Sequence, residues 1–145
     1  MFLVAVSRGQ NYKADGFSLI EIADSASGRV YARKPIENGG DFTIEFIHSV
    51  NNSAVHETFR VDGREIQPVS VRFYSFGAGM PAELEEGQQM IRDGDTIIVT
   101  GFNRNFTELN YIVGTVSDHL LIINGERISL RNLCGRNAHV TLKVK

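Results

Sequence analysis

The sequence predicts an all-β protein, an antiparallel β-sandwich or a partly open barrel of about nine to eleven strands. Apolar residues alternate with polar ones or run in short blocks, and Gly, Asn and Asp interrupt them every ~8–12 positions, a spacing typical of sandwiches and barrels. No segment carries apolar residues at the spacing of a helix longer than about one turn.

The composition predicts a single domain over residues 17–145. The chain has 145 residues, and a chain of this size buries roughly 68–70% of its unfolded surface, enough for stability without a metal or a disulfide. The only cysteine is Cys134, which excludes an internal disulfide. The net charge of −2 lacks the basic footprint of a nucleic-acid-binding protein. We therefore expect no cofactor and no nucleic-acid partner.

Residues 1–16 are expected to lie outside this domain. Met1 to Val6 is apolar, but the run is shorter than the ~7–15 residues of a signal-peptide core or the ~20 of a membrane span. Two interpretations stay open: a flexible start, or the stub of a trimmed membrane anchor.

Turn-forming residues set the ends of the predicted strands. They occupy 24–28, 37–41, 62–64 and 93–95, and Pro35 is expected to end the second strand. Asn124-Gly125 is the strongest hairpin signal in the chain. Loops are predicted at 75–81, 101–107 and 132–137, and the acidic segment 81–87 is predicted to be solvated. The predicted strands are 17–23, 29–34, 42–50, 53–61, 67–74, 89–92, 96–100, 109–113, 118–123, 126–129 and 138–144.

The central hairpin, 42–61, carries two polar residues on an apolar face. If Asn51-Asn52 is a two-residue loop, Phe46 opposes Glu57, and His48 and Glu57 become diagonal neighbours ~7–8 Å apart. A buried carboxylate needs a hydrogen-bond donor, and His48 is the expected one. The pair is either a functional group, such as a general base or a ligand anchor, or a buried polar pair that sets the strand register.

Other candidate chemistry is less defined. The glycine-containing segment 75–81 lacks the pattern of a phosphate loop and of a nucleophile elbow, so it is either a ligand-facing loop or a strand crossover. A small hydrolase would combine His48 with Ser49 or Ser75, although no spacing selects a triad. The histidines and carboxylates show no metal-binding motif, so no metal site is predicted.

A family resemblance joins these segments. It rests on His48-Ser49-Val50, Glu57, the run Ser75-Phe76-Gly77-Ala78-Gly79-Met80-Pro81, and Asp118-His119 before an apolar strand. Together they resemble a bacterial family of unknown function over roughly residues 17–144. Its members are small exported or membrane-anchored proteins, often encoded beside or fused to TRAP-type permeases of the TAXI class. The acidic residue that often follows His-Ser-Val in the family is Asn51 here.

The resemblance implies a setting and a set of positions. The expected function is a non-enzymatic accessory or binding module of a TAXI-type TRAP system, anchored at or secreted to the extracytoplasmic face of a bacterial membrane. Its partners would be the permease, the solute-binding receptor or a small ligand, with membrane contact only through a removed amino-terminal anchor. The alternatives are the small hydrolase and a structural interaction domain without a ligand site. The implied site residues are His48, Ser49, Glu57, Ser75, Gly77, Gly79 and His119.

Overall fold

The computed structural model describes residues 16–48, 52–74 and 83–145. Within them the chain forms eleven strands and one short helix. The elements are β1 (Phe17–Asp24), β2 (Val30–Glu37), β3 (Asp41–His48), β4 (Ser53–Asp62), β5 (Glu65–Tyr74), β6 (Gln89–Asp93), β7 (Thr96–Thr100), β8 (Glu108–Ile112), β9 (His119–Ile123), β10 (Glu126–Ser129), α1 (Leu130–Cys134) and β11 (His139–Val144). In the described part of the chain no helix is long and apolar enough to cross a membrane.

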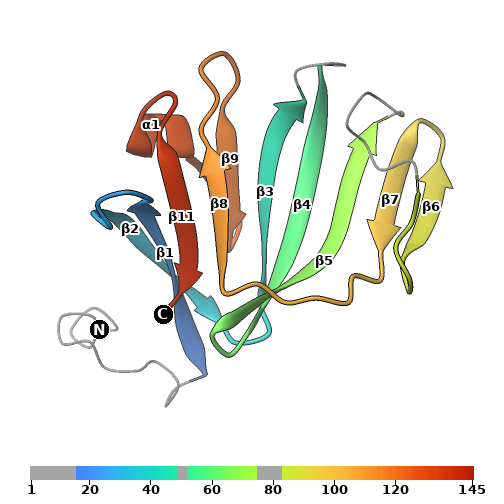
Figure 1. Ribbon diagram of the computed structural model, residues 1–145, viewed down its shortest axis with the longest axis horizontal. Helices are drawn as coiled ribbons and strands as arrows, with labels where there is room; N and C mark the ends of the chain where they lie inside the picture. Colours follow the sequence, from blue (N-terminus) through green and yellow to red (C-terminus); the bar gives the residue numbers. More distant parts are fainter. Residues whose placement is uncertain (1–15, 49–51, 75–82) are drawn as a thin grey trace.

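Two antiparallel sheets pack together and neither closes into a barrel, which confirms the predicted all-β sandwich (Figure 1). The small sheet has four strands in the order β2-β1-β11-β8. The large sheet has seven, in the order β10-β9-β3-β4-β5-β7-β6. Because the small sheet has fewer strands, it covers only part of the large one, and β5, β7 and β6 extend beyond β8 (Figure 1).

The buried apolar residues form two clusters. The main core lies between the sheets and includes Ile22 of β1, Phe42 of β3 and Leu142 of β11. The second cluster consists of Val55, Phe73, Ile97 and Val99, from β4, β5 and β7. This cluster lies beyond the small sheet, where partly buried side chains such as Phe102 pack against it instead.

The central hairpin has a different register from the predicted one. His48 pairs with Ser53, Phe46 with Val55 and Ile44 with Glu57, a shift of two residues. A shift by two keeps every side chain on its predicted face, because strand side chains alternate with a period of two. It does change the neighbours, so His48 and Glu57 are not diagonal partners. The predicted Asn51-Asn52 loop falls partly outside the described residues, which stop at His48 and resume at Asn52.

One predicted strand end and one predicted loop were wrong. Pro35 does not end the second strand, because β2 continues to Glu37 and Pro35 pairs with Leu19. As β2 is an edge strand, the absent N–H of proline costs no ladder hydrogen bond. The segment predicted as a loop at 132–137 overlaps helix α1, which Ser129 caps by accepting a hydrogen bond from the Asn132 amide at 3.0 Å.

The hairpin at Asn124-Gly125 was predicted correctly. Ile123 pairs with Glu126 across it, and φ is 51° at Asn124 and 76° at Gly125. These positive angles are the ones a two-residue turn between antiparallel strands requires. The loop predicted at 101–107 is also present. This segment forms no named strand and connects β7 in the large sheet to β8 in the small sheet (Figure 1).

Candidate functional site

An open groove lies on the inner face of the large sheet beside β8. It consists of two adjoining cavities of about 380 Å³ each, and we call it the Glu57 groove after the residues that line both cavities: Glu57, Val71, Glu85, Gln88 and Phe102. Its floor comes from β4 and β5. One cavity extends to β8 through Leu109, Asn110 and Tyr111, and the other extends to His48 and Phe73.

Glu57 and Tyr111 form the polar centre of the groove. The Tyr111 hydroxyl donates a hydrogen bond of 2.7 Å to Glu57 Oε2. Burial raises the pKa of the Glu57 carboxyl above its ordinary value, although the bond from Tyr111 acts against this. Burial and the neighbouring Glu57 charge raise the pKa of Tyr111 well above its usual range, so the hydroxyl stays a donor. No described residue donates to Glu57 Oε1, which leaves that atom for water or a ligand.

His119 packs against the Tyr111 ring. Its ring stacks on Phe46 with centroids 5.1 Å apart and lies 5.8 Å from the Tyr111 ring. The Gly114 amide donates to His119 Nδ1 at 3.3 Å, so this nitrogen is an acceptor. Burial lowers the pKa of His119, which favours the neutral ring that such an acceptor requires. His119 therefore positions Tyr111 by packing.

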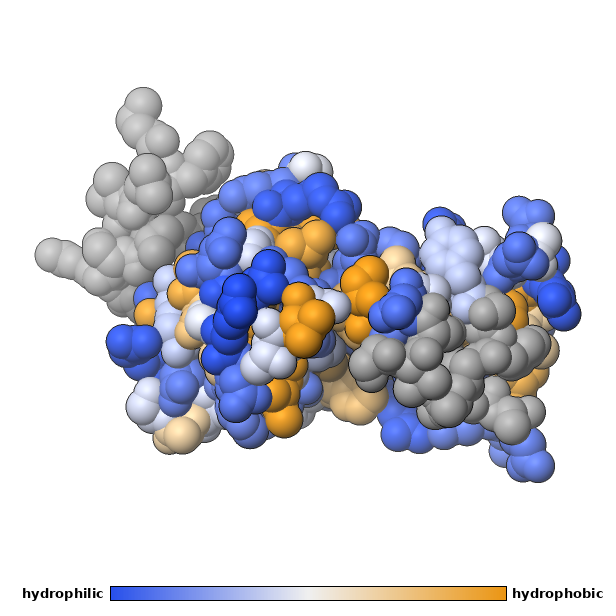
Figure 2. All heavy atoms as spheres, turned by 90° about the horizontal axis from the view of Figure 1, so that it is seen from above, coloured by the Kyte–Doolittle hydropathy of each residue, from blue (hydrophilic) through white to orange (hydrophobic). Residues whose placement is uncertain are grey.

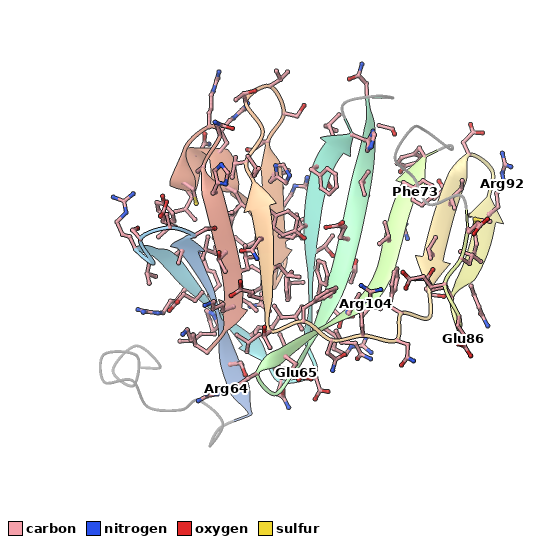
Figure 3. The ribbon with its side chains drawn as sticks, viewed as in Figure 1. Arg64, Glu65, Phe73, Glu86, Arg92 and Arg104 are labelled. Carbon is pink, nitrogen blue, oxygen red and sulfur yellow. The ribbon has the colours of Figure 1, made fainter. Side chains whose placement is uncertain are left out.

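On the side of the groove away from β8, a close backbone contact and an ion pair join the β7–β8 segment to the residues before β6. A Cβ atom on Gly101, where φ is +79°, would lie 2.2 Å from the Gly87 carbonyl oxygen, so only glycine fits there. Arg104 and Glu85 form an exposed ion pair of 3.1 Å between the β7–β8 segment and the residues before β6. Figure 3 shows Arg104 on that segment and Phe73 toward the opposite end of the groove.

Of the three described members of the predicted site, His48 and Glu57 line the groove, whereas His119 lines neither cavity and contacts Tyr111. His48 and Glu57 line the same cavity, yet four strand positions separate Glu57 from Ser53, the partner of His48, or about 13 Å along the strand. The expected donor to Glu57 was wrong, because Tyr111 donates to it. Ser49, Ser75, Gly77 and Gly79 lie outside the described residues.

Tyr111 is the functional candidate that sequence reasoning missed. It lies on the correctly predicted strand of β8, and it alternates with Leu109 and Val113, which are both buried. That alternation indicates that Tyr111 points inward with a polar tip that needs a partner. Nothing in the sequence shows which strand faces it, since Glu57 is 54 residues away.

Metal ligation finds no support in the described residues, which contain no group of three or more His, Cys, Asp or Glu side chains placed to hold an ion. His56, the neighbour of Glu57, lies on the opposite face of the sheet and contacts Glu45 at 2.8 Å. The groove instead combines apolar side chains and a few polar ones with one buried hydrogen-bonding pair, Glu57 and Tyr111. That arrangement suits the binding of a mainly apolar group with a polar atom beside it.

Exposed apolar side chains also occur outside the groove, at the end of β8 and in the segment after it. Val116, between β8 and β9, is 89% exposed, and Ile112 at the end of β8 is 56% exposed. Apolar surface (orange) is also visible near the middle of the molecule in the view from above (Figure 2).

Fold and site together define a class: an open two-sheet β-sandwich with a groove on the part of its larger sheet that the smaller sheet does not cover. The profile described as a domain of unknown function (DUF1850) matches residues 42–130, more than half of the chain, and the protein belongs to this family. The match begins in β3 and ends at the start of α1, so it includes the strands of the groove. A search of curated proteins and a search of solved structures found no match.

Proposed function

We propose that this protein is a non-enzymatic binding module that holds its ligand or partner in the Glu57 groove. The observation that carries the proposal is the inner face of the large sheet beyond the small sheet, where Val71 and Phe102 line a cavity beside the Glu57–Tyr111 hydrogen bond. Concave apolar surfaces with a few polar groups are the usual form of binding sites. Each cavity also falls within the ~300–1,000 Å³ typical of ligand pockets.

The chemistry of the groove limits what it binds. Apolar side chains such as Val71 and Phe102 line it together with polar ones such as Glu85 and Gln88, and Glu57 Oε1 offers one hydrogen-bonding position where the two cavities meet. With the pKa of Glu57 raised, this carboxyl takes up a proton more readily than an exposed one. Burying a further charge beside this carboxyl would be costly, so the groove favours a mainly apolar group that carries a neutral polar atom near Glu57.

The proposed setting is the extracytoplasmic face of a bacterial membrane, where the module would serve a TAXI-type TRAP transporter. This part of the proposal is supported by the resemblance of His48-Ser49-Val50, Glu57 and Asp118-His119 to proteins encoded with such permeases. The partner is then the permease or its solute-binding receptor. The hydrolase alternative requires Ser49 or Ser75, and both serines lie outside the described residues.

The test is to block the groove and measure binding to the transporter components. In Val71→Arg, the new cation enters the groove floor, whereas Ile47→Arg places the same cation on the opposite face of the sheet, where Ile47 is 39% exposed. Pull-down with the purified solute receptor and the solubilised permease should fail for Val71→Arg and succeed for Ile47→Arg. Alanine at His48 and Glu57 should likewise abolish solute uptake in a deletion strain complemented with the variant.

Thermal unfolding shows whether each variant is folded. If a folded Val71→Arg protein still binds the receptor or permease as the unmodified protein does, the groove is not the binding surface. If neither component binds the unmodified protein, the transporter setting is wrong.

A further inference from the structure

The free edge of β8 faces the Glu57 groove. Among the described strands, β8 lies at the end of the small sheet and pairs only with β11. On its other side, Leu109, Asn110 and Tyr111 line the groove. Figure 1 shows β11 on one side of β8, while the large sheet continues past its other side. The groove is therefore bounded by a strand edge as well as by side chains.

The hydrogen bonds around Val113 show which backbone groups lie on that free edge. The Val113 amide donates to the Ala138 carbonyl at 2.9 Å, and the Val113 carbonyl accepts from the Asn137 amide at 2.8 Å. Val113 thus faces the chain segment that leads into β11. The hydrogen-bonding direction of the backbone alternates along an antiparallel strand. The backbone N–H and C=O groups of Leu109 and Tyr111 therefore also point toward β11.

The intervening residues then face away from β11. They are Glu108, Asn110 and Ile112, and no described residue hydrogen-bonds to their backbone N–H or C=O groups. Their backbone groups repeat every ~6.8 Å, the two-residue spacing of a strand. A small ligand can satisfy one such position. An extended peptide satisfies all of them at once.

This edge lacks the features that protect the opposite edge of the same sheet. The edge strand β2 carries Pro35 together with the cations Arg33 and Lys34, and prolines and cations on an edge discourage the addition of another strand. By contrast, β8 contains neither a proline nor a lysine or arginine. Its exposed Ile112 would instead accept a neighbouring strand.

The groove also provides space for the side chains of an added strand. A strand next to β8 lies ~4.8 Å farther along the small sheet and ~10 Å above the large one. Its inward side chains would stand beside Leu109 and Tyr111 and above Val71 and Phe102, which are only partly buried. The inward side chain beside Tyr111 would lie near Glu57, so a hydroxyl or amide side chain suits that position.

We propose that the occupant of the Glu57 groove is an extended segment of a partner protein, which adds to β8 as a further strand of the small sheet. The segment has apolar residues at its inward positions and a neutral polar residue near Glu57. This inference rests on the proposed function, since it names the class of partner for the same groove.

The experiment uses peptides selected on the whole protein from a displayed random decapeptide library. Ile112→Pro removes the outward N–H of Ile112 and leaves the ladder to β11 intact, whereas Ile112→Ala shortens the same exposed side chain and keeps the N–H. The selected peptides should bind Ile112→Pro about tenfold or more weakly than Ile112→Ala, the size of effect expected when an edge hydrogen bond is lost and the proline ring obstructs pairing. Equal binding to both variants would overturn the inference.

A second measurement needs no change in the protein. Methylation of single peptide-bond nitrogens in a selected peptide should weaken binding at every second residue, because only alternate amides of the added strand face β8. Uniform tolerance of methylation, or a selection that yields no binding peptide, contradicts strand addition.

The outcomes also separate this inference from the proposed function. If the permease or receptor binds in a manner sensitive to Val71→Arg but equal for Ile112→Pro and Ile112→Ala, the groove is the site and strand addition is wrong. If selected peptides bind Val71→Arg unchanged, they do not enter the groove, and the inference fails.

Discussion

Replacing Tyr111 by phenylalanine removes the hydroxyl that donates to Glu57 and keeps the ring that lies against His119. The change therefore isolates one hydrogen bond at the centre of the groove. Glu57 Oε2 loses its donor while the carboxyl stays partly buried among apolar residues. Leaving such a group without its partner destabilises the folded state, because water cannot fully replace the lost bond.

The expected size of the effect follows from the cost of an unsatisfied buried polar group. That cost is about 1–3 kcal/mol in the free energy of unfolding. For a chain of this length, 1 kcal/mol corresponds to a shift of roughly 3–4 °C in Tm, so Tyr111→Phe should lower Tm by roughly 3–12 °C. Glu57→Leu should also be destabilising, since it leaves the Tyr111 hydroxyl without an acceptor.

A double-mutant cycle measures the interaction directly. Urea unfolding of the four proteins gives a free energy of unfolding for each, and the double variant should lose less than the sum of the single variants by about 0.5–3 kcal/mol. The reason is that replacing both partners leaves no orphaned polar atom. If the two single effects add within about 0.3 kcal/mol, Tyr111 and Glu57 are not coupled and the description of the groove centre is wrong.

Three further predictions concern pH, backbone packing and the core. Because burial raises the pKa of Glu57, the folded state holds a proton more tightly than the unfolded state, so this contribution to stability is present at low pH and is lost as pH rises through the raised folded value. The stability of Glu57→Gln relative to the unmodified protein should therefore increase between about pH 4 and pH 8 in urea unfolding, and a decrease would contradict the burial of Glu57. Gly101→Ala should destabilise by more than Gly125→Ala in thermal unfolding, because both glycines have positive φ but only at Gly101 would the added Cβ meet backbone, at 2.2 Å; equal effects would mean that the contact with Gly87 relaxes freely. Phe42→Ala removes a ring that is 1% exposed and should cost about 3–5 kcal/mol in the free energy of unfolding, and a loss below about 1 kcal/mol would mean that the core between the sheets repacks.

The hairpin of β3 and β4 shows how far strand prediction can go. Alternation placed Phe46, His48 and Glu57 on one face correctly, because that pattern is local to each strand. The pairing was off by two residues because it depends on how many residues connect the strands. A two-residue loop at Asn51-Asn52 would pair Val50 with Ser53, whereas the structure pairs His48 with Ser53. An error by two preserves the face and changes only the neighbours.

Pro35 and α1 mark a second limit. A proline usually interrupts a strand, but Pro35 lies on an edge strand, where no partner needs its missing N–H. Whether a strand is at an edge depends on the order of the whole sheet. The helix α1 depends on a local signal instead, because the Ser129 side chain caps it within four residues of the same segment.

By itself, the sequence determined the fold class, most of the strands, the Asn124-Gly125 hairpin and the presence of Glu57 on an apolar face. These features depend on residues close together in the chain, whose side-chain directions follow from the two-residue period of a strand. The tertiary structure alone decided that the sheets have unequal width, that β8 ends the smaller one, and that Tyr111 meets Glu57 across 54 residues. Sheet order and sheet packing join distant segments through backbone hydrogen bonds that any residues can make, so no local pattern encodes which apolar face stays uncovered.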